Sequence, residues 1–562
     1  MNTILAPLRE LGEYEDIQKQ LNTQQGKVSI SGCVDSQKLH MIYGFTEKYD
    51  VKLIVTYSDM KAKELLDDCK LYCRESYYFP AKDLIFYQAD IHSNQLIKER
   101  VAVLRKLLEG EPITIVTTFS ALMAHQLPLS VWQENVIEIE EGGIAEEAAI
   151  ARQLVKMGYE KNYQVEAPGQ FSVRGGIVDI FDLTRENPVR IELWGDEVES
   201  IRSFDIESQR SIEKLTEVSI YPATELILSK KALEDGLARM EKDCKKSAAF
   251  FREETKPEEA HRLEQAVAEL KEQVTQFQSF VNLESYIGYF YEETQSLVDF
   301  VADRKLCICL DEPARIEEHA NAVELEFRES MSTRAEKGYI LPEQMNVLYG
   351  AKEIYARLDK NRLLALSTME YKGFPVKFQN RYAVNARNVS SYNNSFPELV
   401  KDLNHYKKNG YRVLLVSASS TRAKRLATDL MDEGLNAFYS DNSQRELQPG
   451  EIMTFYGNVL KGFEYPMLKF VVISESDIFG KQNRKKKKKK VYEGQKIRDF
   501  SDLKIGDYVV HENHGLGIYK GIEKVEVDKV VKDYIKIEYR DGGNLYILAT
   551  GLDVIQKYAS AD

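Results

Sequence analysis

Short apolar runs alternate with amphipathic stretches along the first 135 residues. The runs at 27–31 (KVSIS), 51–56 (VKLIVT) and 113–118 (ITIVTT) have the length and β-branched content of buried strands. Between the last two, residues 97–108 carry apolar side chains every three or four positions, which predicts a helix with one buried face. Strands that alternate with helices predict a parallel, doubly wound sheet.

The pattern changes near residue 165. Residues 171–181, 189–194 and 198–204 alternate apolar and polar side chains with a period of two, and Gly-Gly, Glu-Asn-Pro and Gly-Asp turns join the strands. This spacing is typical of an antiparallel sheet with tight turns. The segment is therefore predicted to be a domain inserted between two α/β pieces.

Further units follow along the chain. Residues 229–280 are charged and helical, and their apolar stripe is interpreted as a face packed on the domain in preference to a coiled-coil partner surface. A second α/β pattern begins near 346, and the last 65 residues alternate like a small β-barrel. The predicted fold class is multidomain α/β plus β, divided into 1–135, 136–221, 222–345, 346–480, a linker at 481–495, and 496–562.

Charge and cysteine usage narrow the function classes. The formal net charge is −13, and seven of the positive charges form one run, Arg484–Lys490, so any nucleic-acid contact should be local. That run is interpreted as an extended tether, with weak contact to a nucleic-acid backbone as the alternative. The six cysteines are scattered, and no apolar stretch predicts a signal peptide or a membrane span. A cytoplasmic protein without a membrane partner is expected.

A nucleotide-binding motif is present in altered form after the first strand. A phosphate-binding loop needs GxxxxGK[ST], in which glycines free backbone N–H groups, lysine neutralises phosphate and the hydroxyl holds magnesium. In GCVDSQKL, Gly32 and Lys38 keep the spacing, but Gln37 replaces the second glycine and Leu39 the hydroxyl. The run LCICL and the acidic pair after it resemble a Walker B strand. The residues of this degenerate nucleotide site are Gly32, Gln37, Lys38, Leu39, Asp311 and Glu312.

No other catalytic pattern is present in the sequence. There is no GxSxG and no HExxH. His511 and His514 lie three apart beside a glycine, which favours a turn over a metal pair. Neither a catalytic residue nor a metal site is predicted.

Two segments carry a family resemblance. Residues 169–211, followed by VSIYPATE, resemble the second domain shared by the repair helicase UvrB and the bacterial transcription-repair coupling factor. Residues 501–560 resemble the coupling factor's RNA-polymerase-interacting domain, which is similar to CarD. Both in this order, with a basic linker between them, are specific to the coupling factor. Because that family continues into a double-stranded-DNA translocase and a regulatory domain, this chain is expected to be its amino-terminal half.

The resemblance implies partners and contact residues. The second domain of the family recruits UvrA, and its contact positions fall on Arg174, Arg190 and Trp194. The family's contact with the RNA polymerase β subunit uses a strand that corresponds to Ile535, Lys536 and Ile537. Damaged or stalled-transcription DNA would be reached only indirectly. No cofactor is expected in this chain, because ATP and magnesium belong to the family's translocase.

Two functional hypotheses follow from different classes. The first is a non-catalytic adaptor that joins stalled RNA polymerase to excision repair, and the second is a UvrB-like ATP-dependent helicase or damage-loading subunit. The replaced glycine and hydroxyl favour the first.

Within the strand that carries the expected UvrA contacts, the period of two predicts that Arg190 and Trp194 share a face. The alternative is that Trp194 is core and Arg190 pairs with Glu192 or Glu197.

Overall fold

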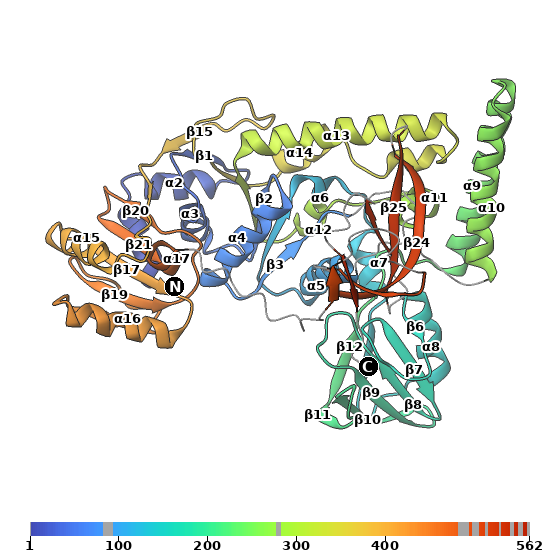
Figure 1. Ribbon diagram of the computed structural model, residues 1–562, viewed down its shortest axis with the longest axis horizontal. Coiled ribbons are helices and arrows are strands. Elements are labelled where there is room, and N and C mark those ends of the chain that lie inside the picture. Colours follow the sequence, from blue (N-terminus) through green and yellow to red (C-terminus); the bar gives the residue numbers. More distant parts are fainter. Residues whose placement is uncertain are drawn as a thin grey trace.

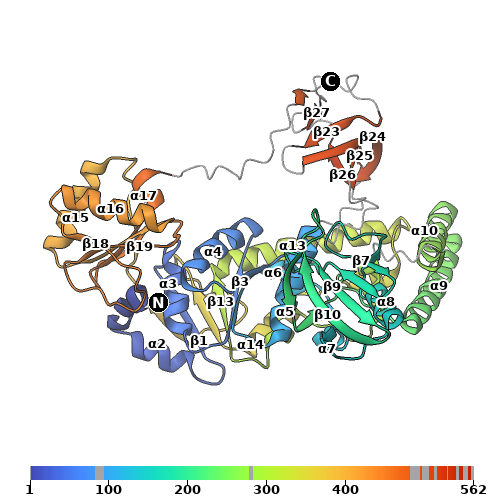
Figure 2. The same ribbon diagram turned by 90° about the horizontal axis from the view of Figure 1, so that it is seen from below.

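The computed structural model has several α/β and β units (Figure 1, Figure 2). It describes residues 2–82, 94–276, 283–480, 494–496, 505–511, 515–527, 530–539, 544–548 and 555–558. Within these residues the strands form one parallel sheet, one sheet that mixes parallel and antiparallel pairs, and further, mainly antiparallel, sheets. The predicted mixture of α/β and β units is confirmed. No helix in the described ranges is long and apolar enough to cross a membrane.

The first unit is built on a seven-stranded sheet in the order β15-β1-β14-β13-β2-β4-β3. Every neighbouring pair is parallel, as the alternation of strands and helices predicted. Its strands are β1 (Lys27–Ser31), β2 (Val51–Thr56), β3 (Ser76–Phe79), β4 (Ile113–Thr118), β13 (Leu306–Asp311), β14 (Leu363–Leu366) and β15 (Asn380–Ala383). The last two correct the predicted boundary at 346, because they complete this sheet and do not belong to the next unit.

Helices cover both faces of this sheet. Along β2, Leu53 faces one apolar cluster and Ile54 faces a second one, so a continuous apolar run is buried on both sides. The helices of this unit are α1 (Asn2–Leu5), α2 (Tyr14–Leu21), α3 (Gln37–Thr46), α4 (Asp59–Tyr72), α5 (Asn94–Glu109), α6 (Phe119–Met123), α7 (Leu129–Glu134), α11 (Ile287–Phe290), α12 (Leu297–Val301), α13 (Pro313–Glu336) and α14 (Ala351–Asp359).

The inserted β domain interrupts the first unit between β4 and β13. Its six-stranded sheet has the order β11-β10-β9-β8-β7-β6, and a separate ladder joins β5 (Ile137–Glu140) to β12 (Glu217–Ile220). Gly175 and Gly176 both have positive φ and make the tight turn between β7 and β8. One face of the sheet packs on α8 (Glu147–Lys156). The strands are β6 (Glu160–Lys161), β7 (Gln170–Arg174), β8 (Ile177–Ile180), β9 (Val189–Trp194), β10 (Glu197–Phe204) and β11 (Ser211–Leu215).

A helical hairpin follows the inserted domain. It consists of α9 (Lys230–Glu253) and α10 (Pro257–Gln276), which lie side by side in both views. The apolar stripe of α10, including Leu263 and Val267, is buried in the same cluster as Met240 of α9. The stripe is therefore a packed face of this chain, as the sequence indicated.

The third unit is an α/β sheet in the order β16-β20-β21-β17-β19-β18. Val413 and Leu415 of its central strand face α15 and α16, whereas Leu414 and Val416 share a core with the first unit. The two units are thus joined by a common apolar core. The elements are β16 (Arg387–Asn388), α15 (Phe396–Lys408), β17 (Arg412–Ser417), α16 (Ser420–Asp432), β18 (Ala437–Tyr439), β19 (Ile452–Tyr456), β20 (Phe463–Tyr465), β21 (Phe470–Ser474) and α17 (Glu475–Phe479).

The C-terminal strands form an antiparallel sheet in the order β22-β27-β23-β24-β25-β26. The predicted all-β fold is confirmed, while its closure into a barrel stays a prediction. The basic run Arg484–Lys490 lies outside the described residues. The strands are β22 (Gly494–Lys496), β23 (Tyr508–His511), β24 (Gly515–Val527), β25 (Val530–Glu538), β26 (Asn544–Leu548) and β27 (Ile555–Tyr558).

Candidate functional site

The altered nucleotide motif forms a buried ion cluster at the carboxyl edge of the first sheet. Lys38 lies in the first turn of α3, directly after β1, and its Nζ is 2.8 Å from Asp311 Oδ1 and 2.6 Å from Glu312 Oε1. Asp311 ends β13, and its Oδ2 accepts a hydrogen bond from Thr56 Oγ1 at 2.8 Å. The structure therefore brings together the lysine and the acidic pair, which are more than 270 residues apart in sequence.

Within the cluster, the Lys38 ammonium and the two carboxylates compensate one another's charge. Burial disfavours the charged ammonium, but the two carboxylates outweigh it and raise the pKa of Lys38. Burial likewise opposes ionisation of Glu312, and the Lys38 ammonium more than compensates, so the pKa of Glu312 is lowered. Lys38 and Glu312 therefore stabilise each other in their charged forms. A phosphate would have to displace carboxylates that already hold the lysine.

The other positions of the motif are occupied by packing. The Gln37 side chain accepts from Val34 N at 3.0 Å and donates to Tyr465 OH at 2.8 Å, which ties α3 to the third unit. Leu39 is fully buried in the core shared with that unit. Gly32 adopts φ +78°, and a Cβ there would lie 2.0 Å from the carbonyl oxygen of Val384. The loop after β1 is thus covered by chain on two sides.

The predicted arginines lie on the outer face of the inserted β domain and share one carboxylate. Arg190 Nε and Nη2 donate to Asp179 at 2.7 and 2.8 Å, and Arg174 Nη2 donates to the same carboxylate at 2.9 Å. Asp179 is opposite Arg190 in the β8–β9 register and is only 1% exposed. Sequence reasoning missed Asp179, whose signal is one acidic residue inside the apolar strand IVDI.

Aromatic rings complete this face. The Arg190 guanidinium lies 4.4 Å from the centroid of the Phe204 ring, and that of Arg174 lies 5.9 Å from Tyr163. Trp194 is 79% exposed at the end of β9, whereas its neighbour Leu193 is buried. The predicted shared face of Arg190 and Trp194 is confirmed, and a core tryptophan is ruled out.

Arg190 pairs with Asp179 and not with Glu192 or Glu197, the two partners that the sequence offered as alternatives. Glu192 accepts from Ser200 Oγ at 2.7 Å and pairs with Arg202, so it is held by the neighbouring strand β10. Arg190 is directed to Asp179 because the β8–β9 register places them opposite each other. One arginine of the pair remains more accessible, since the Arg174 side chain is 37% exposed and that of Arg190 is 18% exposed.

The predicted polymerase contact lies on a strand inside the C-terminal sheet. β25 pairs with β24 on one side and with β26 on the other, and Ile535 is opposite both Ile522 and Ile547. Ile535 and Ile537 are fully buried, and Lys536 Nζ is 3.0 Å from Glu523 Oε1. β25 is therefore an interior strand, because two ladders occupy both of its edges. Among the strands that the structure describes here, β22 and β26 are the end strands of this sheet.

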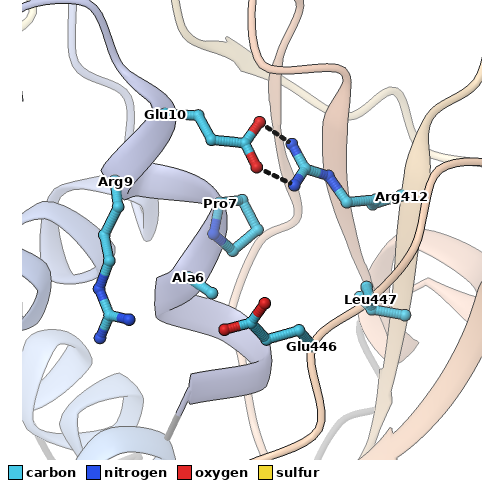
Figure 3. Close-up of a pocket in the computed structure, with 7 residues that line it drawn as sticks. All are labelled: Ala6, Pro7, Arg9, Glu10, Arg412, Glu446 and Leu447. Atoms are coloured by element: carbon cyan, nitrogen blue, oxygen red, sulfur yellow. Dashed lines mark hydrogen bonds and ion pairs between the residues drawn. The ribbon is translucent and has the colours of Figure 1, made fainter.

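A small polar cavity of about 220 Å³ lies between the N-terminal helices and the third unit (Figure 3). Its acidic groups already have partners: Glu10 forms two bonds to Arg412 at 2.6 and 2.8 Å, and Glu446 accepts from Asn2. These contacts join the two units. Among the described residues, no group of three or more histidine, cysteine or acidic side chains is arranged to hold a metal ion.

Comparison with known proteins places these surfaces in a family context. A UvrB interaction domain model matches residues 137–226, and a CarD-like/TRCF RID domain model matches residues 503–559. The first covers the arginine face, and the second covers β23 to β27.

Curated relatives match along the whole chain. A transcription-repair-coupling factor of Bacillus subtilis is 34% identical over 568 residues, which is 100% of this chain and 48% of that protein. Its namesakes in Staphylococcus epidermidis and Staphylococcus aureus are 28% and 27% identical over 96% and 100% of this chain, and 46% and 47% of their own lengths. The chain thus spans about half the length of these relatives. From end to end, it is a homologue of the transcription-repair-coupling factors, with a UvrB interaction domain and a CarD-like/TRCF RID domain.

Proposed function

We propose that this chain is a non-catalytic adaptor of transcription-coupled repair. It binds UvrA through the inserted β domain and the β subunit of RNA polymerase through the C-terminal sheet, and so brings nucleotide excision repair to stalled transcription. The observation that carries this proposal is the presence of both interaction domains in one chain that is homologous throughout to coupling factors.

The UvrA contact is assigned to the face of Arg174, Arg190 and Trp194. Asp179 holds both guanidinium groups in place before a partner binds, so the arginine side chains lose less conformational entropy on binding. An exposed tryptophan beside oriented arginines has the composition of an interface hot spot. Asp179 satisfies only part of the donor capacity of Arg174, so an acidic group on UvrA fits this face.

The polymerase contact is assigned to the edge of the C-terminal sheet. An edge strand can pair with a strand of the partner, so that backbone hydrogen bonds supply affinity. β26 provides such an edge, and Ile535 and Ile537 form the core that supports it from the adjacent strand. The proposed role of β25 is therefore to hold the binding edge in place.

The second hypothesis, an ATP-dependent helicase or loading subunit, has less support. The Lys38 ammonium is held by two carboxylates, the second glycine is a glutamine bonded to Tyr465, and the loop is covered. We therefore propose that the site is a degenerate nucleotide site that does not turn over ATP. ATP and magnesium would act in the translocase that the family carries.

The decisive experiment is to titrate the full chain with purified UvrA and, separately, with RNA polymerase β subunit. We expect Trp194→Ala to weaken UvrA binding by about thirtyfold or more, equivalent to about 2 kcal/mol, without loss of stability. Arg174→Ala should weaken binding while Arg190 still holds Asp179. Lys230→Ala, at an exposed ion pair with Glu234 on α9 outside the inserted domain, is the matched control and should bind normally. If wild type captures neither partner, the adaptor hypothesis is wrong.

A further inference from the structure

An exposed isoleucine lies beside the tryptophan of the proposed UvrA-binding face. Ile144 precedes α8 and is 80% exposed, which is as accessible as Trp194. It forms an antiparallel bridge with Glu197, and Glu197 is also opposite Trp194 in the β9–β10 ladder. Residues directly opposite each other in antiparallel pairs project from the same face. Ile144, Glu197 and Trp194 therefore form one row across three chain segments.

The segment that carries Ile144 is held in place by backbone hydrogen bonds. Gly142 N donates to Val198 O at 2.8 Å, Val198 N donates to Gly143 O at 2.9 Å, and Ala145 N donates to Asp196 O at 2.7 Å. The isoleucine thus stands on a fixed extension of the sheet. A large apolar side chain held in this way presents its surface without further loss of backbone entropy on binding.

We infer that Ile144 is a fourth contact of the UvrA-binding face, which then runs from Arg174 past Trp194 to the segment before α8. This inference rests on the proposed function and extends its site. The match to the UvrB interaction domain starts at residue 137 and so includes Ile144. Neighbouring strands are about 4.8 Å apart, so the apolar side chains of Ile144 and Trp194 start about 10 Å apart, with the Glu197 carboxylate between them.

This row specifies the chemistry of the surface that would receive it. UvrA should offer two apolar recesses about 10 Å apart, with a hydrogen-bond donor or cation between them to meet Glu197. An acidic group would meet Arg174 on the same face. The site therefore alternates in charge along its length, which fixes the orientation of the partner.

The test is titration of UvrA with the full chain carrying Ile144→Ser, Trp194→Ala or Ile212→Ser. Ile212 on β11 is the matched control, because it is a 55% exposed isoleucine of the same domain. It lies beside the Ser203 end of β10, and the length of β10 from Ser203 to Glu197 separates it from the row by about 20 Å. We expect Ile144→Ser to weaken binding about five- to tenfold and Ile212→Ser to leave it unchanged. Thermal unfolding should be unchanged in both, since the side chains are exposed.

The outcomes separate the inference from the proposed function. If Trp194→Ala weakens binding but Ile144→Ser does not, the extended site is wrong and the adaptor proposal stands. Equal losses for Ile144→Ser and Ile212→Ser would also overturn the inference, because the effect would not be local. Absence of UvrA binding by wild type would overturn both.

Discussion

Replacement of Lys38 by methionine tests whether the altered nucleotide motif is now structural. The substitution leaves the carboxylates of Asp311 and Glu312 buried, 2% and 16% exposed, without their cation. Removal of one partner from a buried ion pair typically costs about 3–5 kcal/mol. Thr56 still donates to Asp311, and Thr368 donates to Glu312 through its N–H and hydroxyl, so we expect a loss near the lower limit, about 3 kcal/mol.

The pH dependence of this loss has a definite sign. In wild type, Lys38 holds the pKa of Glu312 below its usual value, so the resulting stabilisation is present at neutral pH and is lost only as the pH falls through that acidic range. In Lys38→Met, the ammonium no longer offsets the burial of Glu312, so the pKa of that carboxyl group rises. The destabilisation should therefore be largest near pH 8 and shrink toward pH 5, where the Glu312 carboxylate takes up a proton.

Tryptophan fluorescence during urea unfolding measures this effect in the right part of the molecule. The chain has two tryptophans, and Trp132 is buried in the core of the first unit. In a Trp194→Phe background, Trp132 alone reports unfolding of that unit.

The triple variant Lys38→Met, Asp311→Asn, Glu312→Gln should recover most of the lost stability, because it leaves no uncompensated charge. A Lys38→Met chain that is as stable as wild type at pH 8 would refute a structural role for this cluster.

Four further predictions concern the altered motif, a buried aspartate and the C-terminal sheet. Steady-state ATP turnover by the full chain should stay at background, and turnover that Lys38→Ala abolishes would contradict this. The carboxylate of Asp68 on α4 is buried and accepts hydrogen bonds from Ser36 Oγ at 2.6 Å and Leu460 N at 2.7 Å, and burial raises its pKa to about 7. Its unfavourable contribution to stability therefore grows as the pH rises from about 4 to 7. Asp68→Asn should stabilise the chain at pH 8 by about 2–4 kcal/mol in urea unfolding but have little effect at pH 4; equal effects at both pH values would be inconsistent with it. Ile535→Arg should unfold the C-terminal sheet, seen as lost β-sheet circular dichroism, because it places a charge in a fully buried position; a folded variant would argue against a core role. Single prolines along β26 should abolish capture of polymerase β only where the backbone N–H faces outward, and normal capture by every folded variant would exclude this edge.

Patterns local to the sequence predicted the elements and the orientation of their side chains. The period of two in VRIELW placed Arg190 and Trp194 on the outer face, because alternation along a strand depends on its own backbone geometry. The alternation of apolar strands and helices predicted the parallel sheet. The sequence grouped Lys38 with Asp311 and Glu312, and the structure brings these three residues together at the end of β13, since the carboxyl ends of parallel strands lie on one edge of a sheet.

Pairing between distant segments was decided only by the tertiary structure. That Asp179 holds both arginines depends on the β8–β9 register, and that β25 is interior depends on the two ladders beside it. The hydrogen bond from Gln37 to Tyr465 joins residues 428 positions apart. Ile144 lies in one row with Trp194 because it forms a bridge with Glu197, which is opposite Trp194. A strand pattern specifies which side chains share a face, but the identity of its neighbours depends on packing and hydrogen bonds that form only when the whole chain has folded.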